Sequence, residues 1–301
     1  MSVFEALAGR LKDAFPRRRA DPASSVFADT SMAQVAWERR RRAAMHFGIV
    51  GAVLGALGGV IAFAPAAWLA AAVAAGTDGR LLLAEARGTV WRGSALLVLT
   101  GGAGSRDAAA LPSRLEWSIG LNGLAAEINL RQACCLTGSV PLLVRPGFGR
   151  FSVVVPPMPD GLGQWPAAWL SGLGTPFNTL QPGGALRVAS PGATVEFVQG
   201  RLRFVGSLSV DAVDISSRLT TLDVLGSYRV VINGGEGGET TALQLSTLAG
   251  ALQLSGRGQW AGAKLRFTGE ATVAEGAEAA LNNLLNIIGR RQGVRSIISI
   301  G

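Results

Sequence analysis

Histidine is almost missing from this sequence: His46 is the only one among 301 residues. A Ser-His-Asp triad needs histidine as its general base, and many catalytic metal sites need histidine ligands. Both are therefore excluded from the chain beyond residue 78. The glycine-rich run 101–104 lacks the spacing and the Lys-Ser/Thr pair of a phosphate-binding loop, so a hairpin tip is its simpler interpretation. We expect no catalytic residue, no cofactor, no metal and no small-molecule substrate, and hence a protein that is not an enzyme.

Cysteine is equally scarce, since only Cys134 and Cys135 occur. Adjacent cysteines cannot form a framework of disulfides that close long loops. A vicinal bridge is the alternative outside the cytoplasm, but we favour two reduced or partly buried thiols at a strand edge. Neither state supports a metal site, which would need about four ligands at ordered spacing.

Aromatic residues make up only 6% of the chain, although its net charge is +8. A nucleic-acid-binding surface combines a basic stripe with interleaved aromatics. Here the cations alternate singly with apolar residues, so no nucleic-acid partner is expected. Part of the positive charge gathers at the N-terminus, where residues 1–45 contain nine Lys or Arg and five Asp or Glu.

Charged residues are absent from positions 47–75, a run of 29 residues. Because ~20 apolar helical residues cross a bilayer core about 30 Å thick, the run predicts one transmembrane anchor, which we place at residues 46–77. Pro65 divides the run and predicts a kink, since proline fits poorly inside a helix.

Three glycines of the anchor, Gly51, Gly55 and Gly59, are spaced four residues apart. This spacing lets a second transmembrane helix approach closely. The three are candidates for helix packing, and a chance pattern in a glycine-rich chain is the alternative.

The orientation of the anchor follows from the four consecutive arginines at 39–42. Basic residues beside a span are retained in the cytoplasm, so the N-terminus is predicted inside and residues 78–301 outside. A cleaved signal peptide with its cleavage site at 72–76 is the alternative. The charged prelude and the long apolar run exceed the usual 15–30 residues of such signals, which favours an anchor.

The basic segment 1–45 is predicted to contain a short amphipathic helix. Ser2 and Glu5 have the spacing of a capping box, and Pro16 ends the pattern. The apolar stripe consists of Phe4, Leu7, Leu11 and Phe15. It would contact the membrane surface or a partner helix, or else belong to a weakly ordered tail; residues 17–36 are predicted to be a flexible linker.

Beyond the anchor the apolar period changes to two. Apolar and polar residues alternate along 114–119, 127–131, 201–211 and 264–273. This pattern is typical of half-buried strands in antiparallel sheets. Asn233-Gly234 predicts a two-residue hairpin turn after the strand 228–232.

Two helices are predicted to interrupt the strands. The first carries the apolar spacing Leu162, Trp165, Trp169 and Leu173. The second carries Leu281, Leu284, Leu285 and Ile288 and ends at Gly289 in a left-handed cap. An apolar strand, 294–300, closes the chain. The fold class is therefore mainly β: one N-terminal transmembrane helix followed by a single antiparallel β domain with two short helices.

Three segments of this domain resemble protein N of the bacterial type II secretion system. They are Gly88-Thr89-Val90-Trp91-Arg92-Gly93; Leu173-Gly174-Thr175-Pro176-Phe177-Asn178-Thr179-Leu180 followed by Pro182-Gly183-Gly184; and Gly258-Gln259-Trp260 leading to Asn283-Leu284-Leu285-Asn286-Ile287-Ile288-Gly289-Arg290-Arg291. The resemblance runs from the anchor to the C-terminus, and the long segment 1–45 is less typical of that family.

The resemblance implies a single-pass protein of the inner membrane with a periplasmic β domain. It implies an accessory component that supports export of folded proteins across the outer membrane. Its partners would be other components of the system: the inner-membrane platform, the pseudopilins or the secretin. The domain also resembles AsmA-like proteins, whose sandwich or half-barrel groove suggests an alternative, lipid handling between membranes. A groove with an apolar floor would favour lipid handling, and a closed sandwich with a filled interior would favour scaffolding.

Overall fold

The structure is a computed structural model that describes residues 25–198, 201–235, 241–261 and 264–301. It consists of two units, Met1–Ile61 and Ala62–Gly301. We describe each unit by itself.

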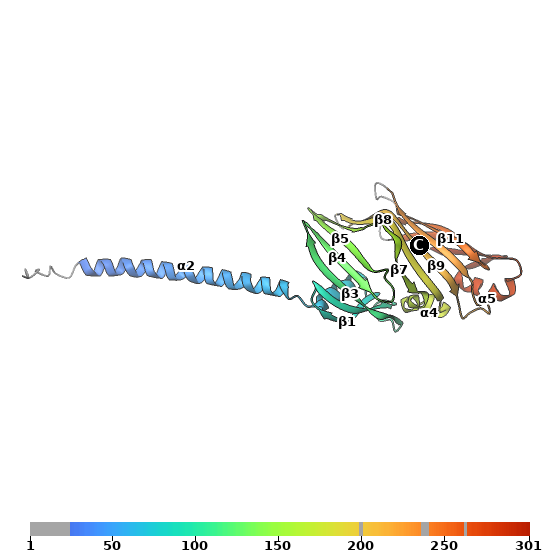
Figure 1. Cartoon of the computed structure of the whole chain (residues 1–301), viewed down its shortest axis with the longest axis horizontal. Coiled ribbons are helices and arrows are strands. Elements are labelled where there is room, and N and C mark those ends of the chain that lie inside the picture. The colour runs from blue at the N-terminus through green and yellow to red at the C-terminus, as the bar shows by residue number, and fades with distance from the viewer. Residues whose placement is uncertain (1–24, 199–200, 236–240, 262–263) are drawn as a thin grey trace, which may run out of the picture. The chain divides into compact units, whose positions relative to one another are not determined.

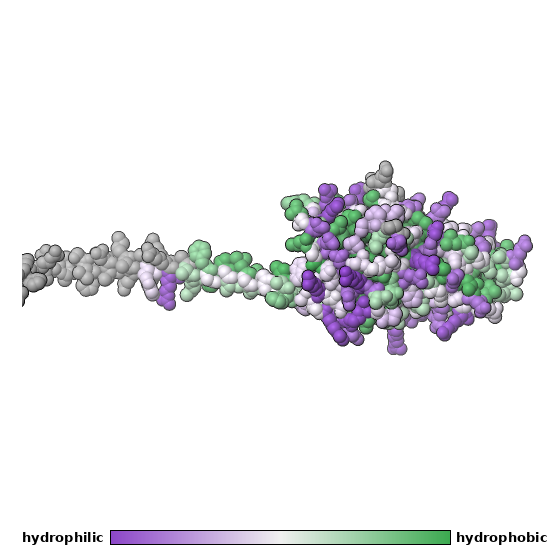
Figure 2. All heavy atoms as spheres, in the orientation of Figure 1, coloured by the Kyte–Doolittle hydropathy of each residue, from purple (hydrophilic) through white to green (hydrophobic). Residues whose placement is uncertain are grey.

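The first unit is built on one long helix, α2 (Ser25–Ala62). Its segment Ala44–Ala62 is long and apolar enough to cross a membrane, and its side chains are exposed (Figure 2). The prediction of a linker at 17–36 is wrong from residue 25 onward, because residues 25–47 contain neither proline nor glycine and continue into the helix. The predicted amphipathic helix at 2–15 lies outside the described residues.

The second unit begins with a break in the apolar run at Pro65. Helix α2 ends at Ala62, and a separate helix, α3 (Ala66–Gly76), starts directly after Pro65. Proline has no N–H to donate and cannot continue α2, but it fits just ahead of a new helix. The predicted kink is thus a full interruption, and α3 belongs to the β-rich unit.

All strands of the second unit form one 15-stranded sheet (Figure 1). The strands are β1 (Leu81–Gly88), β2 (Arg92–Thr100), β3 (Ala108–Asn122), β4 (Ala125–Gln132), β5 (Ser139–Gly147), β6 (Arg150–Val155), β7 (Met158–Pro166), β8 (Gly183–Val198), β9 (Arg201–Ser216), β10 (Gly226–Gly234), β11 (Thr241–Gly250), β12 (Leu252–Ala261), β13 (Lys264–Val273), β14 (Arg290–Gln292) and β15 (Arg295–Ile300). Their order is β1-β2-β3-β4-β5-β6-β8-β9-β10-β11-β12-β13-β15-β14. The sheet is antiparallel and open rather than closed into a sandwich, and the four alternating segments lie in β3, β4, β9 and β13, as predicted.

Strand β7 stands outside this order. The first half of β8 pairs with β7 and the second half pairs with β6. The free edge of β7 is held by the loop after β4, where the Gln164 N–H donates to the Cys135 carbonyl over 2.7 Å. A side chain at Gly163 would collide with that carbonyl, so only glycine allows this approach.

Three further helical elements lie against the sheet: η1 (Ala167–Leu173, a 3-10 helix), α4 (Phe177–Leu180) and α5 (Glu278–Ile288). The predicted C-terminal helix is confirmed as α5. The predicted helix through Trp165 is wrong, because Leu162 and Trp165 belong to β7 and the 3-10 helix starts only after Pro166. Proline is tolerated there as the residue that precedes a helix, not inside one.

The predicted Asn233-Gly234 turn is also wrong. Both residues pair within the sheet, with Ala242 and Thr241, so they are not the central residues of a turn. A Cβ at Gly234 would collide with the Phe204 carbonyl of β9. The glycine therefore serves a close strand approach instead of a turn.

Two hydrophobic clusters stabilise the unit at different parts of the sheet. One lies under α3 and is centred on Ala66, Leu83, Ala95 and Trp117. The other lies under α5 and contains Leu225, Tyr228, Leu252, Ala271, Leu281, Leu284 and Leu285. Each cluster fastens one helix onto the sheet.

Candidate functional site

The segment Gly88–Gly93 forms the turn between β1 and β2. Gly88 has φ +88°, and Thr89 closes the turn because its Oγ1 accepts from the Arg92 N–H over 3.1 Å. The Val90 N–H donates to the Ala64 carbonyl, and Pro65 pairs with Thr89. The turn therefore holds the start of α3 on the sheet.

Trp117 fills the space under this turn. Its side chain is 5% exposed, and its Nε1–H donates to the Val90 carbonyl over 3.0 Å. A Cβ at Gly93 would lie 2.5 Å from the Trp117 ring, so glycine makes room for the indole. Trp91 is partly exposed, and its carbonyl accepts from the Ile119 N–H. The residues of the first motif thus hold the start of α3 and the Trp117 indole in place, and they present no reactive group.

The second motif builds the corner between η1 and α4. Its residues are Gly174, Thr175, Pro176, Phe177 and Asn178, with a cis peptide bond before Pro176. Asn178 carries the hydrogen bonds that hold the corner: its N–H donates to the Gly174 carbonyl, and its Nδ2 donates to Asp107 Oδ2 over 3.1 Å. Asp107 lies in the loop between β2 and β3, so the corner is tied to the N-terminal half of the sheet.

The third motif fastens α5. Leu284 and Leu285 are each 1% exposed in the cluster under that helix. Gly289 has φ −171° and is extended, so the predicted left-handed cap is wrong. Glycine is needed there because a Cβ would collide with the Ile297 carbonyl of β15.

The remaining residues of this motif lie on strands. Trp260 is half-buried in β12, opposite Leu265 of β13. Arg290 and Arg291 are exposed in β14, and Arg291 donates to the carbonyls of Gly293 and Asn282. The three motifs therefore do not converge on one site, and each secures a different helical element.

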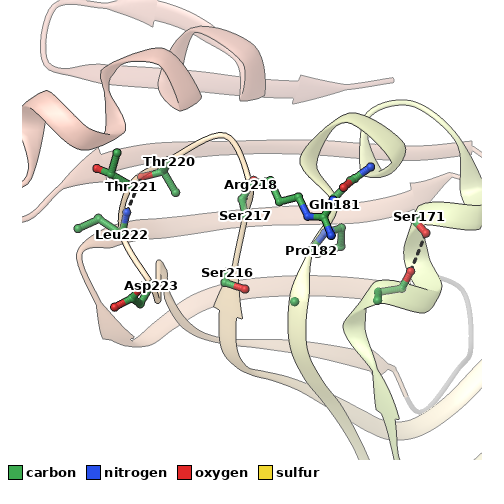
Figure 3. A pocket seen from close by; sticks show the side chains of 12 residues that line it. Ser171, Gln181, Pro182, Ser216, Ser217, Arg218, Thr220, Thr221, Leu222 and Asp223 are labelled. Atoms are coloured by element: carbon green, nitrogen blue, oxygen red, sulfur yellow. Dashed lines mark hydrogen bonds between the residues drawn. The ribbon is translucent and has the colours of Figure 1, made fainter.

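A cavity of about 530 Å³ lies between η1 and the loop after β9 (Figure 3). Its lining includes the hydroxyls of Ser171, Ser217 and Thr220. All three donate to backbone carbonyls: Ser171 to Ala168, Ser217 to Leu180 and Thr220 to Ala280. These hydroxyls hold loops together, and none of the three donates to Asp223, the one carboxylate among the described lining residues.

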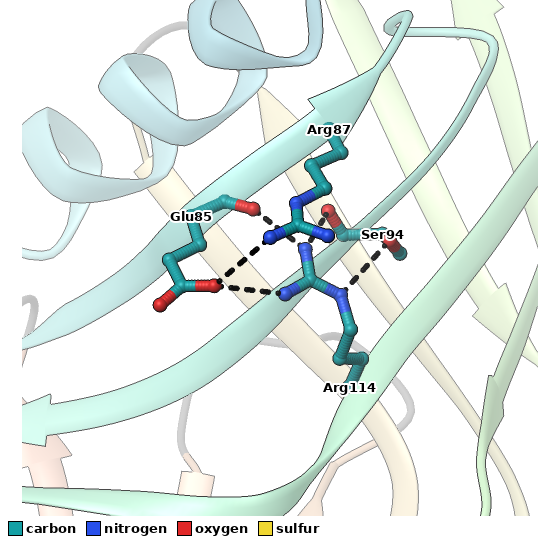
Figure 4. Close-up of polar contacts among 4 residues, drawn as sticks. All are labelled: Glu85, Arg87, Ser94 and Arg114. Carbon is teal, nitrogen blue, oxygen red and sulfur yellow. Dashed lines mark hydrogen bonds and ion pairs between the residues drawn. The ribbon is translucent and has the colours of Figure 1, made fainter.

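Several ionised side chains also have structural partners. Arg114 on β3 donates to the Ser94 hydroxyl and to both the carboxylate and the carbonyl of Glu85, across the bulge in β1 (Figure 4). Arg229 binds Asp211 through two hydrogen bonds of 2.6 and 2.7 Å. This guanidinium lowers the pKa of the Asp211 carboxyl. Within the described residues no group of three His, Cys, Asp or Glu is placed to hold a metal ion.

Cys134 and Cys135 form a vicinal disulfide. The interpretation as two thiols is therefore wrong. The pair lies in the loop that holds the edge of β7, and Cys135 is 4% exposed. Nothing in the sequence beyond the adjacency itself distinguished the two states.

One face of the sheet is mainly apolar, with the buried polar residues Gln132 and Ser296 also on it. Between the clusters under α3 and α5, Val140 and Ala193 on this face are buried, and we call the half-buried apolar side chains around them the open apolar face. Its members are Ile128, Leu142, Val144, Val153, Val195, Phe204, Leu208, Val230, Ile232 and Leu243. Cross-strand pairs such as Val153 with Val195 and Leu208 with Ile232 make it continuous. Sequence reasoning found the alternation and left a closed sandwich and an open groove as alternatives; among the described residues no helix is packed on the middle of this face.

A comparison with protein-family models decides the relationship of this chain. Residues 79–297 match the model of the type II secretion system (T2SS) protein N. The chain belongs to this family. The match covers the main part of the chain, and the resemblance inferred from the three motifs is confirmed. Searches of curated proteins and of solved structures gave no match.

Membership of the T2SS protein N family identifies a component of the type II secretion system, a family of structural components and not of enzymes. The motif residues Val90, Asn178 and Leu284 are engaged in packing and in hydrogen bonds that hold helical elements. The glycines Gly51, Gly55 and Gly59 have open space around each Cβ position in α2, and their role in helix packing stays a prediction.

Proposed function

We propose that this chain supports export of folded proteins through contacts with other components of the type II secretion system. The observation that carries the proposal is the family match over residues 79–297. The arrangement of the motifs supports the proposal, because their residues hold helical elements on the sheet. Catalysis would instead need a nucleophile and a base within reach of each other. The inner-membrane platform, the pseudopilins and the secretin are the candidate partners.

The hairpin tips supply the surface that we propose for these contacts. Leu121 and Leu124 at the β3–β4 tip are 85% and 95% exposed, and Phe148 at the β5–β6 tip is also fully exposed. Exposed large apolar side chains grouped at loop tips are typical of protein contact sites. The two tips lie at the same end of the sheet, because each follows an odd-numbered strand in an antiparallel run.

Loss of the gene is expected to lower export of type II substrates while their folding in the periplasm stays intact. The measurement is the secreted fraction of a native substrate, with restoration by the full chain as control. A Leu124→Glu chain should restore a smaller secreted fraction than a Ser255→Glu chain. Ser255→Glu is the control, because it changes an exposed residue on the polar face of β12. Unchanged secretion, together with a shifted phospholipid or lipopolysaccharide distribution, would contradict the scaffold function.

That contrary outcome would favour the second candidate function, lipid handling between membranes. The observation that favours it is the open apolar face, which is wide, continuous and half-exposed. Binding of acyl chains to this face would be favourable by about 25 cal/mol for each Å² of apolar surface removed from water.

We propose one membrane span at Ala44–Ala62, with the N-terminus in the cytoplasm and the β-rich unit in the periplasm. The arginines at 39–42 support this direction. Reporter fusions at Ser25 and Gly235 should report the cytoplasm and the periplasm respectively. The same compartment for both fusions would disprove the topology.

The glycine face of the span is expected to mediate association with another helix. Replacing Gly55 with isoleucine adds a branched side chain where the backbones would meet, so association should weaken without release of the protein from membranes. A quantitative self-association assay in membranes, with co-purification of partners, measures this. Ala56→Ile, which adds a branched side chain about 100° around the helix from Gly55, is the matched control. Equal association of the two variants would assign the face no role.

A further inference from the structure

Helix α3 has an apolar surface on both sides. Ala66, Leu69, Ala70 and Val73 face the sheet and pack with the cluster around Trp117. The opposite side consists of Ala67, Trp68, Ala71, Ala72 and Ala75, all exposed. A helix that is apolar all round belongs in a protein core or in a membrane, not on a wet surface.

The chain places this helix close to the proposed span. Only three residues, 63–65, separate the end of α2 from the start of α3. The four steps from Ala62 to Ala66 reach at most about 14 Å, and Pro65 is itself paired with Thr89. Helix α3 therefore starts within about 14 Å of the end of the span, in or next to the lipid headgroup layer, if Ala44–Ala62 crosses the membrane.

The side chains around this point suit the same environment. Phe63 is 79% exposed and Trp68 is 55% exposed. Aromatic rings, tryptophan above all, collect at the interface between lipid and water. Arg92, in the turn that holds Ala64 and Pro65, is exposed and carries the positive charge that lipid phosphates attract.

We propose that the exposed side of α3 is embedded in the interfacial layer of the periplasmic leaflet, with Trp68 as its anchor and Arg92 at the phosphates. The partner of this face is thus the lipid surface itself. The inference rests on the membrane span proposed above. It makes the β-rich unit a body seated on the bilayer instead of one suspended from a flexible tether.

The test uses the full chain in vesicles of phosphatidylethanolamine and phosphatidylglycerol. A single cysteine carrying a nitroxide is placed at Ala71, and separately at Ala75, on the exposed side of α3. Collisions with oxygen, which concentrates in lipid, are compared with collisions with a water-soluble nickel complex. Leu54 within the span and Ser255 on the polar face of the sheet give the lipid and water references, and the unsubstituted chain gives the background from the disulfide-bonded pair.

Labels at Ala71 and Ala75 should report a position about 5–10 Å below the phosphates, the depth typical of interfacial helices. If the label at Leu54 reports lipid but the labels at Ala71 and Ala75 are as accessible to the nickel complex as the label at Ser255, the inference is wrong. Protection from both collision partners would also overturn it, because protein and not lipid would then cover α3. A water-exposed Leu54 would instead disprove the span, and with it the topology in the proposed function.

Discussion

Replacing Leu284 with aspartate is expected to unfold the β-rich unit. The Leu284 side chain is 1% exposed in the cluster that joins α5 to the sheet, next to Leu281 and Leu285. An unpaired carboxylate in such a place costs several kcal/mol, and a domain of this kind is stable by about 5–15 kcal/mol in total. Loss of the leucine packing adds ~2–5 kcal/mol. The measurement is resistance to a protease added to the membrane-bound full chain.

The matched control is Ile287→Asp on the same helix. Ile287 is 42% exposed, so a carboxylate there stays hydrated and should leave the resistance close to that of the unsubstituted chain. Equal resistance of the two variants would show that Leu284 is accessible. The stripe would then be a contact surface for a partner and not part of the core.

Replacing Trp117 with alanine is expected to destabilise the other end of the unit by ~3–5 kcal/mol, the usual cost of removing a large buried aromatic. The change empties the space under the Gly88–Gly93 turn and leaves the Val90 carbonyl without the indole donor. Because α3 packs on this indole, its amide hydrogens should exchange faster with solvent. Hydrogen exchange of the full chain, resolved by peptide, measures the effect.

Leu121→Ala on the same strand is the control, since Leu121 is 85% exposed and its truncation creates no cavity. Faster exchange confined to α3, β1 and β2 in the Trp117 variant would support the role of the indole in this cluster. Exchange unchanged in α3 in both variants would mean that α3 is held by something other than Trp117.

The elements that the sequence predicted are those with strong local periodicity. The stripe Leu281, Leu284, Leu285 specifies α5 because one helix face is buried and the other is wet. The alternation along β13 specifies a strand for the same reason. The apolar spacing through Trp165 was misleading, because a strand that ends at Pro166 and a 3-10 helix that follows reproduce a helical period by coincidence.

Other features depend on contacts between distant parts of the chain. Gly234 and Gly289 looked like a turn and a helix cap, but each avoids a collision with a carbonyl of a neighbouring strand. The alternation of apolar and polar residues is equally consistent with a sandwich and with an open sheet, since both bury one face of each strand. The open apolar face therefore became visible only once the strands were placed in one sheet. The motif glycines Gly88 and Gly93 marked the right segment, but their purpose follows from Trp117 and Ala64.

The strand order has a consequence for how this protein is made. From β1 to β13 each strand lies beside its predecessor in the chain, with only β7 set aside against β8. A polypeptide that emerges N-terminus first on the far side of a membrane can therefore add strand to strand as each arrives, because every ladder needs only residues already delivered. Such sequential growth keeps loop closures short and folding fast. Strand β14 is the exception, because its partner β15 follows it in the chain and must first pair with β13.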